Sequence, residues 1–185
     1  MATFVAIFLF RCIMELWDLY DSNRIKTDKT WVRDSKETFP KDLFRVVVHV
    51  AIFNSQGELL IQQRQDHKTY GGTWDLSAAG SIISGETSKQ GAERETLEEL
   101  GLKISLPNRP ILTTTFTQGF DDYYLTKQDL DLKDLTLQPS EVKNAKWATL
   151  PQILQTLDSG EFMAYSPDFI KLLFFINEKG KIWNR

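Results

Sequence analysis

Short runs of apolar residues alternate with polar turns along most of this chain, and their spacing predicts strands on both sides of one central helix. The β-branched run at residues 43–53 is apolar almost without interruption, which predicts a strand that is buried on both faces. Residues 54–57 predict a turn, and residues 58–63 predict the strand that returns beside it. Upstream, residues 15–20 and 25–33 predict a hairpin that adds an extra edge to the sheet.

The period of the pattern becomes helical from Thr87 onward. Thr87 or Ser88 is suited to cap the start of this helix, and Gly101 stands where the helix should stop. One stripe along it is suited to dock on a core, and its members are Ala92, Thr96 and Leu100. The sequence therefore predicts one amphipathic helix between the two groups of strands.

A second stripe of this helix is acidic. At about 100° per residue, Glu95, Glu98 and Glu99 fall on one face. Like charges four positions apart, here Glu95 and Glu99, weaken a helix by about 0.2–0.5 kcal/mol. We therefore expect a cation to neutralise the three carboxylates, and ligands that are all oxygen favour Mg²⁺ or Mn²⁺ over zinc.

The second half of the chain predicts further strands and two helices. Residues 127–138 lack a clear period, and we interpret them as a variable loop. The predicted elements are strands at 102–105 and 145–148, a hairpin at 111–120 and 122–126 with Gly119 or Asp121 in its turn, and helices at 150–157 and 168–177. This order predicts an α/β (α+β) sandwich with a mixed sheet between helices.

Composition narrows the possible partners and the compartment. The 185 residues contain 42% hydrophobic side chains, which is enough for a core, and a net charge of −3, which predicts no nucleic-acid partner. Cys12 is the only cysteine, so an internal disulfide and a cysteine-based zinc site are excluded, and a reducing cytoplasm is expected. The two histidines, His49 and His67, are too far apart for a zinc site, and we expect His49 to be a satisfied residue of the sheet.

The first residues form an apolar stretch that differs from the rest of the chain. Its apolar run at residues 3–10 is far shorter than the roughly 20 residues of a membrane span, and residues 1–13 have no positively charged start and no small-residue cleavage site. Three interpretations stay open: a strand packed on the domain, a weak membrane-proximal anchor, or an extension upstream of the true start. We favour the extension, with a single domain at 14–185 and no membrane partner.

The acidic helix lies in a segment, residues 80–102, whose fixed positions resemble the Nudix box. We call residues 80–102 the box segment. The matching positions are Gly80, Glu86, Arg94, Glu95, Glu98, Glu99, Gly101 and Leu102. Thr96 departs from the pattern, because the family prefers a bulky apolar residue there. The resemblance implies a Mg²⁺-dependent pyrophosphatase that hydrolyses a nucleoside diphosphate linked to a further group, or a related small-molecule diphosphate.

The resemblance also implies roles for individual residues. Glu95, Glu98, Glu99 and the Gly80 carbonyl (or that of the neighbouring Ala79) are the expected metal ligands, and Glu98 or Glu141 is the expected general base. A salt-bridged surface role for Glu141 stays open. Arg64 ends its predicted strand where the family commonly has an arginine, and it is suited to bind a phosphate oxygen. Glu86 and Arg94 are expected to pair and hold the loop against the helix.

A wider match, over residues 15–157, resembles the isopentenyl-diphosphate isomerase-like branch of the family. Isomerases of that branch carry a catalytic cysteine just before the box glycine and a metal-binding histidine just after it. This chain has Ala79 and Ser81 at those positions, so hydrolysis is the better expectation. An isomerase with a rearranged site and a non-catalytic diphosphate-binding module remain the alternatives. The sequence leaves the oligomeric state open, a homodimer included.

Overall fold

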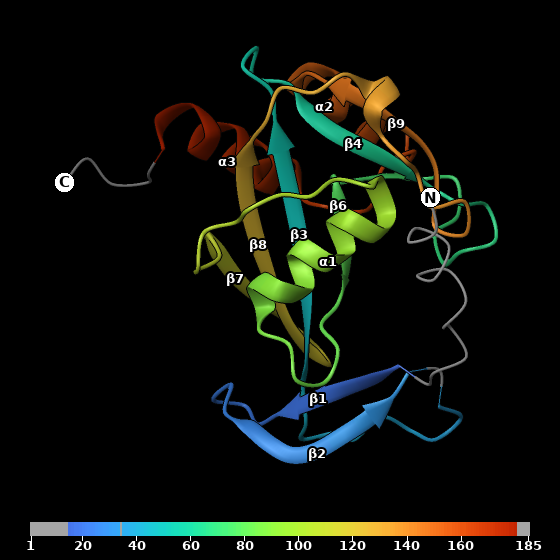
Figure 1. The fold of residues 1–185 in the computed structure, drawn as a ribbon, viewed down its shortest axis with the longest axis vertical. Coiled ribbons are helices and arrows are strands. Elements are labelled where there is room, and N and C mark those ends of the chain that lie inside the picture. The colour runs from blue at the N-terminus through green and yellow to red at the C-terminus, as the bar shows by residue number, and fades with distance from the viewer. Residues whose placement is uncertain (1–14, 34, 181–185) are drawn as a thin grey trace, which may run out of the picture.

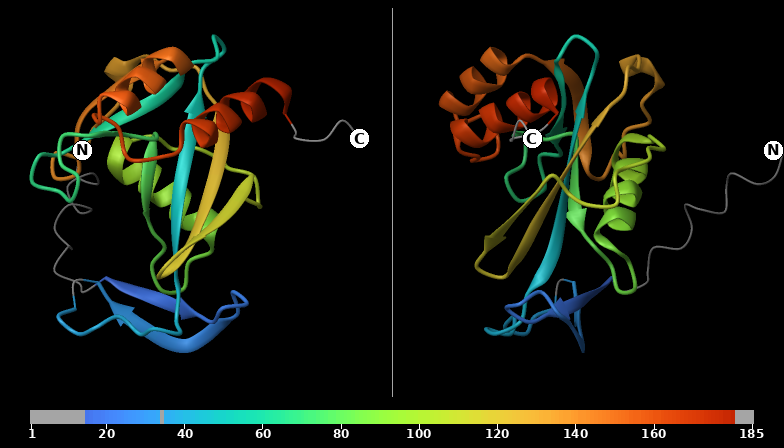
Figure 2. Two further views of the ribbon diagram at one scale, coloured as in Figure 1. Left: turned by 180° about the vertical axis from the view of Figure 1, so that it is seen from behind. Right: turned by 90° about the vertical axis from the view of Figure 1, so that its left-hand side faces the viewer.

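A computed structural model describes residues 15–33 and 35–180. A seven-stranded mixed sheet forms its centre, with α1 against one face and α2 and α3 against the other (Figures 1 and 2). This arrangement confirms the predicted α/β sandwich. The elements are β1 (Leu16–Tyr20), β2 (Lys26–Val32), β3 (Arg45–Phe53), β4 (Leu59–Arg64), β5 (Trp74–Asp75), β6 (Ala78–Ser81), α1 (Ser88–Leu100), β7 (Leu112–Phe116), β8 (Gly119–Lys127), a 3₁₀ turn at Leu132–Asp134, β9 (Val142–Ala148), α2 (Leu150–Asp158) and α3 (Pro167–Lys179).

Strand β3 is the axis of the sheet. It runs parallel to β8 along its whole length and antiparallel to β6 over Val47–Val50. Its pairing with β4 is limited to Phe53 and Leu59, so the predicted hairpin separates directly after its turn. The separation leaves room for β6, and with it the start of the box segment, at the centre of the sheet.

The separated strands are joined by the fully buried Ser77. Its hydroxyl accepts a hydrogen bond from the Ile52 amide of β3 at 2.9 Å and donates to the Leu60 carbonyl of β4 at 2.6 Å. Backbone groups that the ladder leaves unpaired are thereby satisfied, which avoids the cost of burying them alone.

Two apolar cores fill the layers on either side of the sheet. Val46, Val48 and Val50 of β3 belong to the core beneath α1, and Ala51 and Phe53 belong to the core beneath α2 and α3. The uninterrupted apolar run of this strand is therefore buried on both faces, as predicted. The helices at the end of the chain match their predicted positions and cover the second core.

The N-terminal hairpin is not an edge of the main sheet, and that prediction is wrong. Strands β1 and β2 form a sheet of their own at one end of the molecule (Figure 1). One antiparallel bridge, Tyr20 to Phe44, joins the hairpin to the chain just before β3. The hairpin cannot continue this pairing into the main sheet, because β6 and β8 already occupy both sides of β3.

Two predictions downstream of α1 are also wrong. Residues 102–105 form no strand, and the Leu106 amide donates instead to the Glu93 carboxylate at 2.9 Å. The hairpin turn lies at residues 117–118, so Gly119 and Asp121 are inside β8 rather than in the turn. Gly119 and Asp121 were the misleading signal, because glycine and aspartate are common in turns and rare in strands.

The described residues contain no helix that is both long and apolar enough to cross a membrane. The expected extension at residues 1–13 lies outside the described residues.

Candidate active site

Helix α1 is fixed at both ends by the predicted residues. Thr87 is the N-cap. Its side chain accepts a hydrogen bond from the Gln90 amide, and the Gln90 side chain accepts one from the Thr87 amide. Gly101 ends the helix with φ of +70°, a left-handed conformation that glycine adopts without strain. These caps set where along the helix each glutamate projects.

The predicted stripe docks α1 on the sheet, including the one residue that departs from the family pattern. Ala92, Thr96 and Leu100 are each 0% exposed. The Thr96 hydroxyl donates to the Ala92 carbonyl at 2.8 Å, so its polar group is satisfied within the helix. Thr96 therefore costs the packing little and leaves the acidic face unchanged.

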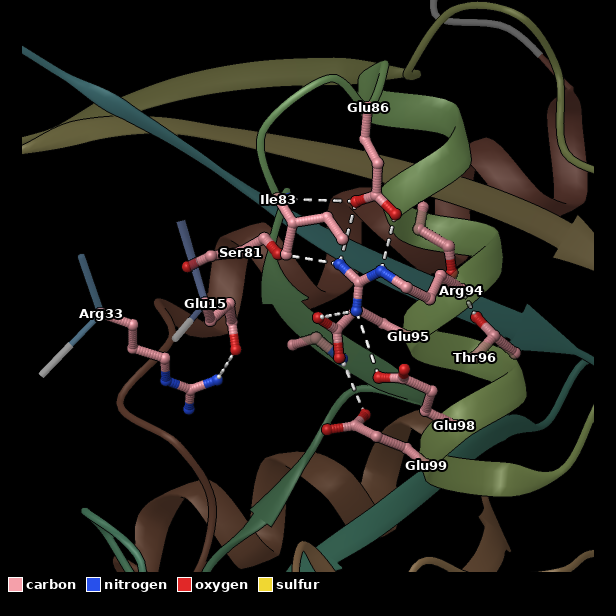
Figure 3. Close-up of polar contacts among 12 residues, drawn as sticks. Glu15, Arg33, Ser81, Ile83, Glu86, Arg94, Glu95, Thr96, Glu98 and Glu99 are labelled. Atoms are coloured by element: carbon pink, nitrogen blue, oxygen red, sulfur yellow. Dashed lines mark hydrogen bonds and ion pairs between the residues drawn. The ribbon is translucent and has the colours of Figure 1, made fainter. Parts of the chain in front are cut away.

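The three glutamates project from one face of α1, and Arg94 lies between two of them (Figure 3). The Arg94 Nη1 group donates to Glu95 at 2.8 Å and to Glu98 at 3.2 Å. On its other side, Arg94 pairs with Glu86 at 2.7 Å and donates to the Ser81 carbonyl at 3.0 Å. The expected pairing of Glu86 with Arg94 is confirmed, and it ties the loop before α1 to the acidic face.

Glu99 connects the helix to the gap in the sheet. Its Oε2 atom accepts from Gln62 Nε2 of β4 at 2.9 Å and from the Ala79 amide of β6 at 3.1 Å. Burial, together with the neighbouring Glu95 carboxylate, raises the pKa of Glu99 well above its ordinary value. Both donors are neutral, so the charge of an ionised Glu99 is left without a cation.

Glu95 is the second under-compensated carboxylate. Burial raises its pKa to about 7, and Glu98 adds to that shift while Arg94 opposes it. Glu98 is the most accessible of the three side chains, at 31% exposed against 13% for Glu95. The buried carboxylates Glu95 and Glu99 are thus incompletely compensated, because Glu95 shares Arg94 with Glu86 and Glu98, and Glu99 accepts from neutral donors.

The surroundings of these carboxylates suit a divalent cation in their oxygen donors and in the close approach of the Gly80 backbone. Gly80 packs so closely on Glu95 that a Cβ atom there would collide with the carboxylate. Gln62 Oε1, beside Glu99, is a buried acceptor without a hydrogen-bond partner. Within residues 15–33 and 35–180, no three metal-binding side chains already converge, and Arg94 bridges Glu95 to Glu98 instead.

The other two predicted residues lie on neighbouring elements. Arg64, at the end of β4, donates through Nε to the Thr69 carbonyl at 3.1 Å and approaches Asp75 at 3.9 Å. Glu141 pairs with Lys68 at 2.7 Å, which is the salt-bridged alternative. Its loop is nevertheless attached to α1, because the Gln138 amide donates to the Glu99 carbonyl at 2.9 Å.

His49 is a satisfied residue of the sheet, as expected. Its Nε2 atom lies 3.0 Å from Asp121 and its Nδ1 atom lies 3.3 Å from the Tyr165 hydroxyl. Tyr165 in turn donates to the buried Asp75 at 3.0 Å. Both ring nitrogens are engaged, which leaves His49 no nitrogen for a metal.

The sequence interpretation missed two residues that lie outside the box segment and form hydrogen bonds with residues in it, Gln62 and Asp18. Gln62 gave no signal, because nothing in a strand pattern identifies the partner of a distant glutamate. Asp18 of β1 accepts hydrogen bonds from Ser84 Oγ and from the Gly85 amide, both at 2.8 Å. The only signal for Asp18 was its place in the N-terminal stretch that resembles the isomerase-like branch.

Comparisons with known proteins agree with this geometry. The family model described as NUDIX domain matches residues 43–166. An uncharacterized Nudix hydrolase from Listeria innocua is 46% identical over 173 residues, which cover 92% of this chain and 96% of that protein. An isopentenyl-diphosphate Delta-isomerase from Pectobacterium atrosepticum is 28% identical over 69% of this chain and 74% of that protein.

The fold is shared with solved structures. The crystal structure of DR0079 from Deinococcus radiodurans superposes with a TM-score of 0.67 at 25% identity and covers 86% of this chain and 97% of that one. Membership of one family thus accounts for the sheet, for the three helices and for the glycine that precedes the acidic helix α1. The chain belongs to the Nudix hydrolase family.

Proposed function

We propose that the protein is a Mg²⁺-dependent hydrolase of a phosphoanhydride bond in a nucleoside diphosphate derivative or a related diphosphate, with Mn²⁺ as a substitute ion. The observation that carries this proposal is the excess of carboxylate on α1 beside Gly80. Arg94 is shared among Glu86, Glu95 and Glu98, and among the described residues the hydrogen-bond partners of the buried Glu99 are both neutral donors.

The charge imbalance supports a cation more strongly than the spacing of the glutamates alone. Burial of an uncompensated carboxylate is costly, and the metal-free protein avoids part of the cost by raising the pKa of Glu95 and Glu99. A divalent cation would remove the cost directly while keeping both groups ionised. Oxygen-rich surroundings favour Mg²⁺, which also binds the oxygens of a diphosphate.

The side chains then have distinct tasks. Glu95, Glu98 and Glu99, with the Gly80 carbonyl, would hold the ion, which supplies charge neutralisation and makes water more acidic. Glu98 is the better candidate for the general base, because its carboxylate is the most accessible of the three. Glu141 is the second candidate and would first have to leave Lys68. Arg64 is suited to hold a phosphate oxygen at the end of β4.

The chain lacks the catalytic cysteine that the isomerase alternative would need. Proton transfer to an alkene needs a proton donor beside the carbon, and in the isomerases that this chain resembles the cysteine before the box glycine has that role. Ala79 occupies that position, and the chain's single cysteine, Cys12, is far from it in sequence. The 28% identity to an isomerase therefore supports a shared diphosphate-binding fold better than a shared reaction.

The test is turnover of a panel of nucleoside diphosphate derivatives and isoprenoid diphosphates with Mg²⁺, using wild type and Glu98→Gln. We expect turnover of a panel member and a decrease of about 10²- to 10⁴-fold in the variant, the usual contribution of a general base. Glu93→Gln is the matched control, because Glu93 lies on another face of α1 and pairs with Lys89. Isomerised isopentenyl diphosphate without any hydrolysis would contradict the proposal.

A further inference from the structure

Arg45, the first residue of β3, lies beside the box segment without taking part in its ion pairs. Its Nη1 atom donates to the Ser81 hydroxyl at 2.6 Å. Ser81 directly follows Gly80, and its carbonyl accepts Arg94 Nη2 at 3.0 Å. The Arg45 guanidinium therefore borders the same short segment that faces the glutamates.

Two aromatic rings from different elements hold the guanidinium in place. The Arg45 Cζ atom lies 4.5 Å from the ring centre of Trp17 in β1 and 5.5 Å from that of Phe116 in β7. Such contacts orient a cation and stabilise it by about 0.5–2 kcal/mol, but they leave its charge unneutralised. The planar group is thus fixed while most of its donors remain available.

Arg45 differs from the other partly buried arginines in having no carboxylate beside it. In the described part of the chain, no acidic group forms an ion pair with Arg45, whereas each of the others has one at 3.9 Å or less: Arg24 with Asp122, Arg64 with Asp75, and Arg94 with Glu86. Asp121 and Glu15 act on Arg45 only from a greater distance, and Arg33 opposes them. A partly buried cation of this kind gains most from an anion that arrives from outside.

We propose that Arg45 binds a phosphate oxygen of the substrate's diphosphate, in an anion site that Trp17 and Phe116 hold open. The inference rests on the proposed function. The diphosphate would lie along the β6 backbone at Gly80 and Ser81. Arg45 is on the face of β6 that carries the Ser81 side chain, and the acidic face of α1 is on the opposite face, beside Gly80. Guanidinium groups suit this task, because their planar donors match phosphate oxygens in pairs.

The site depends on the N-terminal hairpin. Trp17 belongs to β1, which precedes residues 43–166 of the matched family model. Trp17 is itself positioned by a hydrogen bond from its Nε1 atom to Glu15 at 2.9 Å, and Glu15 pairs with Arg33 at 2.8 Å (the latter pair is shown in Figure 3). Part of the substrate site would therefore be built by a segment outside the family domain.

The test measures binding of methylenediphosphonate, a diphosphate analogue that cannot be hydrolysed, to the full chain by calorimetry at saturating Mg²⁺. We expect Arg45→Met to weaken this binding by about 10- to 100-fold and to leave Mg²⁺ binding unchanged. Arg45→Lys keeps the charge but loses the paired donors, so its affinity for methylenediphosphonate should lie between those of wild type and Arg45→Met.

Lys146→Met is the matched control, because Lys146 also lies over an aromatic ring, at 4.1 Å from Trp74, and the change removes the same charge. Equal affinity of folded Arg45→Met and wild type would overturn the inference, as would an equal loss in Lys146→Met or no binding by wild type. Thermal unfolding of each variant shows whether it is folded. If Arg45→Met does not fold, the affinity of Arg45→Lys is compared with that of wild type instead.

Turnover of the substrate panel separates the two proposals. If wild type hydrolyses a diphosphate and Arg45→Met has the same KM as wild type, the proposed role of Arg45 is refuted and the hydrolase proposal stands. If wild type binds methylenediphosphonate through Arg45 but hydrolyses nothing, the anion site stands and the hydrolase proposal fails.

Discussion

Two carboxylates, Asp18 of β1 and Glu99 of α1, are buried to a similar degree but have opposite surroundings. Asp18 is 3% exposed and Glu99 is 5% exposed. Burial alone would raise the pKa of Asp18, but donors from Gly85, Lys26 and Ser84 hold that pKa below its ordinary value. Glu99 receives only two neutral donors, and its pKa is raised well above the ordinary value.

Under the proposed function, compensation by neighbouring donors, rather than burial, distinguishes a structural acid such as Asp18 from a metal-binding acid such as Glu99. Asp18 has a salt bridge to Lys26 at 2.6 Å and holds the loop before α1. Asp122, which is 0% exposed, does the same for the helix start, because it accepts from both Arg24 and Ser88. The acids of α1 are left short of positive charge, which is the arrangement expected of groups that await a cation.

The strongest way to sharpen this comparison is the same isosteric change at both acids. Asp18→Asn should lower the free energy of unfolding by about 2–3 kcal/mol, because it weakens hydrogen bonds to a charged acceptor and breaks the pair with Lys26. Glu99→Gln should leave the free energy of unfolding at pH 8 without metal unchanged or higher, because it removes an uncompensated buried charge.

Denaturant unfolding of the two variants and wild type in EDTA measures both effects. Glu161→Gln serves as the control, because Glu161 is exposed and its side chain bonds only to Ser159 in the described structure. A loss of stability in Glu99→Gln as large as that in Asp18→Asn would mean that Glu99 is a structural acid as well.

A smaller effect is expected at the residue that orients Glu99. Gln62→Leu removes the hydrogen bond to Glu99 Oε2, and we expect Mg²⁺ affinity to fall by about 10- to 100-fold, the usual cost of losing a partner of a metal ligand. The neighbouring Gln63→Leu is the matched control, because Gln63 donates to the Gly72 carbonyl instead. Calorimetric titration with Mg²⁺ reports the affinities, and equal losses in both variants would refute a specific role for Gln62.

Features with a local cause could be predicted from the sequence. The caps Thr87 and Gly101 and the buried run of β3 follow from spacing and from intrinsic conformational preference. The pairing of Glu86 with Arg94 came from the family pattern, and the structure places it as expected.

Features that depend on distant contacts could not be predicted in the same way. The separation of β3 from β4 depends on Ser77 and on the insertion of β6, and no local pattern encodes either. The hairpin was misplaced for the same reason, since both sides of β3 were already occupied by strands that come later in the chain. The contacts of Gln62 with Glu99 and of Arg45 with Ser81 likewise exist only because the fold brings distant residues together.

The most direct test of the central claim is the pH dependence of stability with and without Mg²⁺. A raised pKa means that the folded state binds more protons than the unfolded state between the ordinary value of 4.5 and about 7, so stability should fall as pH rises through that window. Asp18 adds no slope there, because its depressed pKa affects stability only in acid, below its ordinary value of 3.8.

We therefore predict that the free energy of unfolding in EDTA decreases by about 2–3 kcal/mol between pH 5 and pH 8. Saturating Mg²⁺ should reverse this trend, because the ion binds the ionised carboxylates of the folded state. A stability that is flat or rising with pH in EDTA, and that Mg²⁺ does not change, would contradict the claim that the acids of α1 are a cation site.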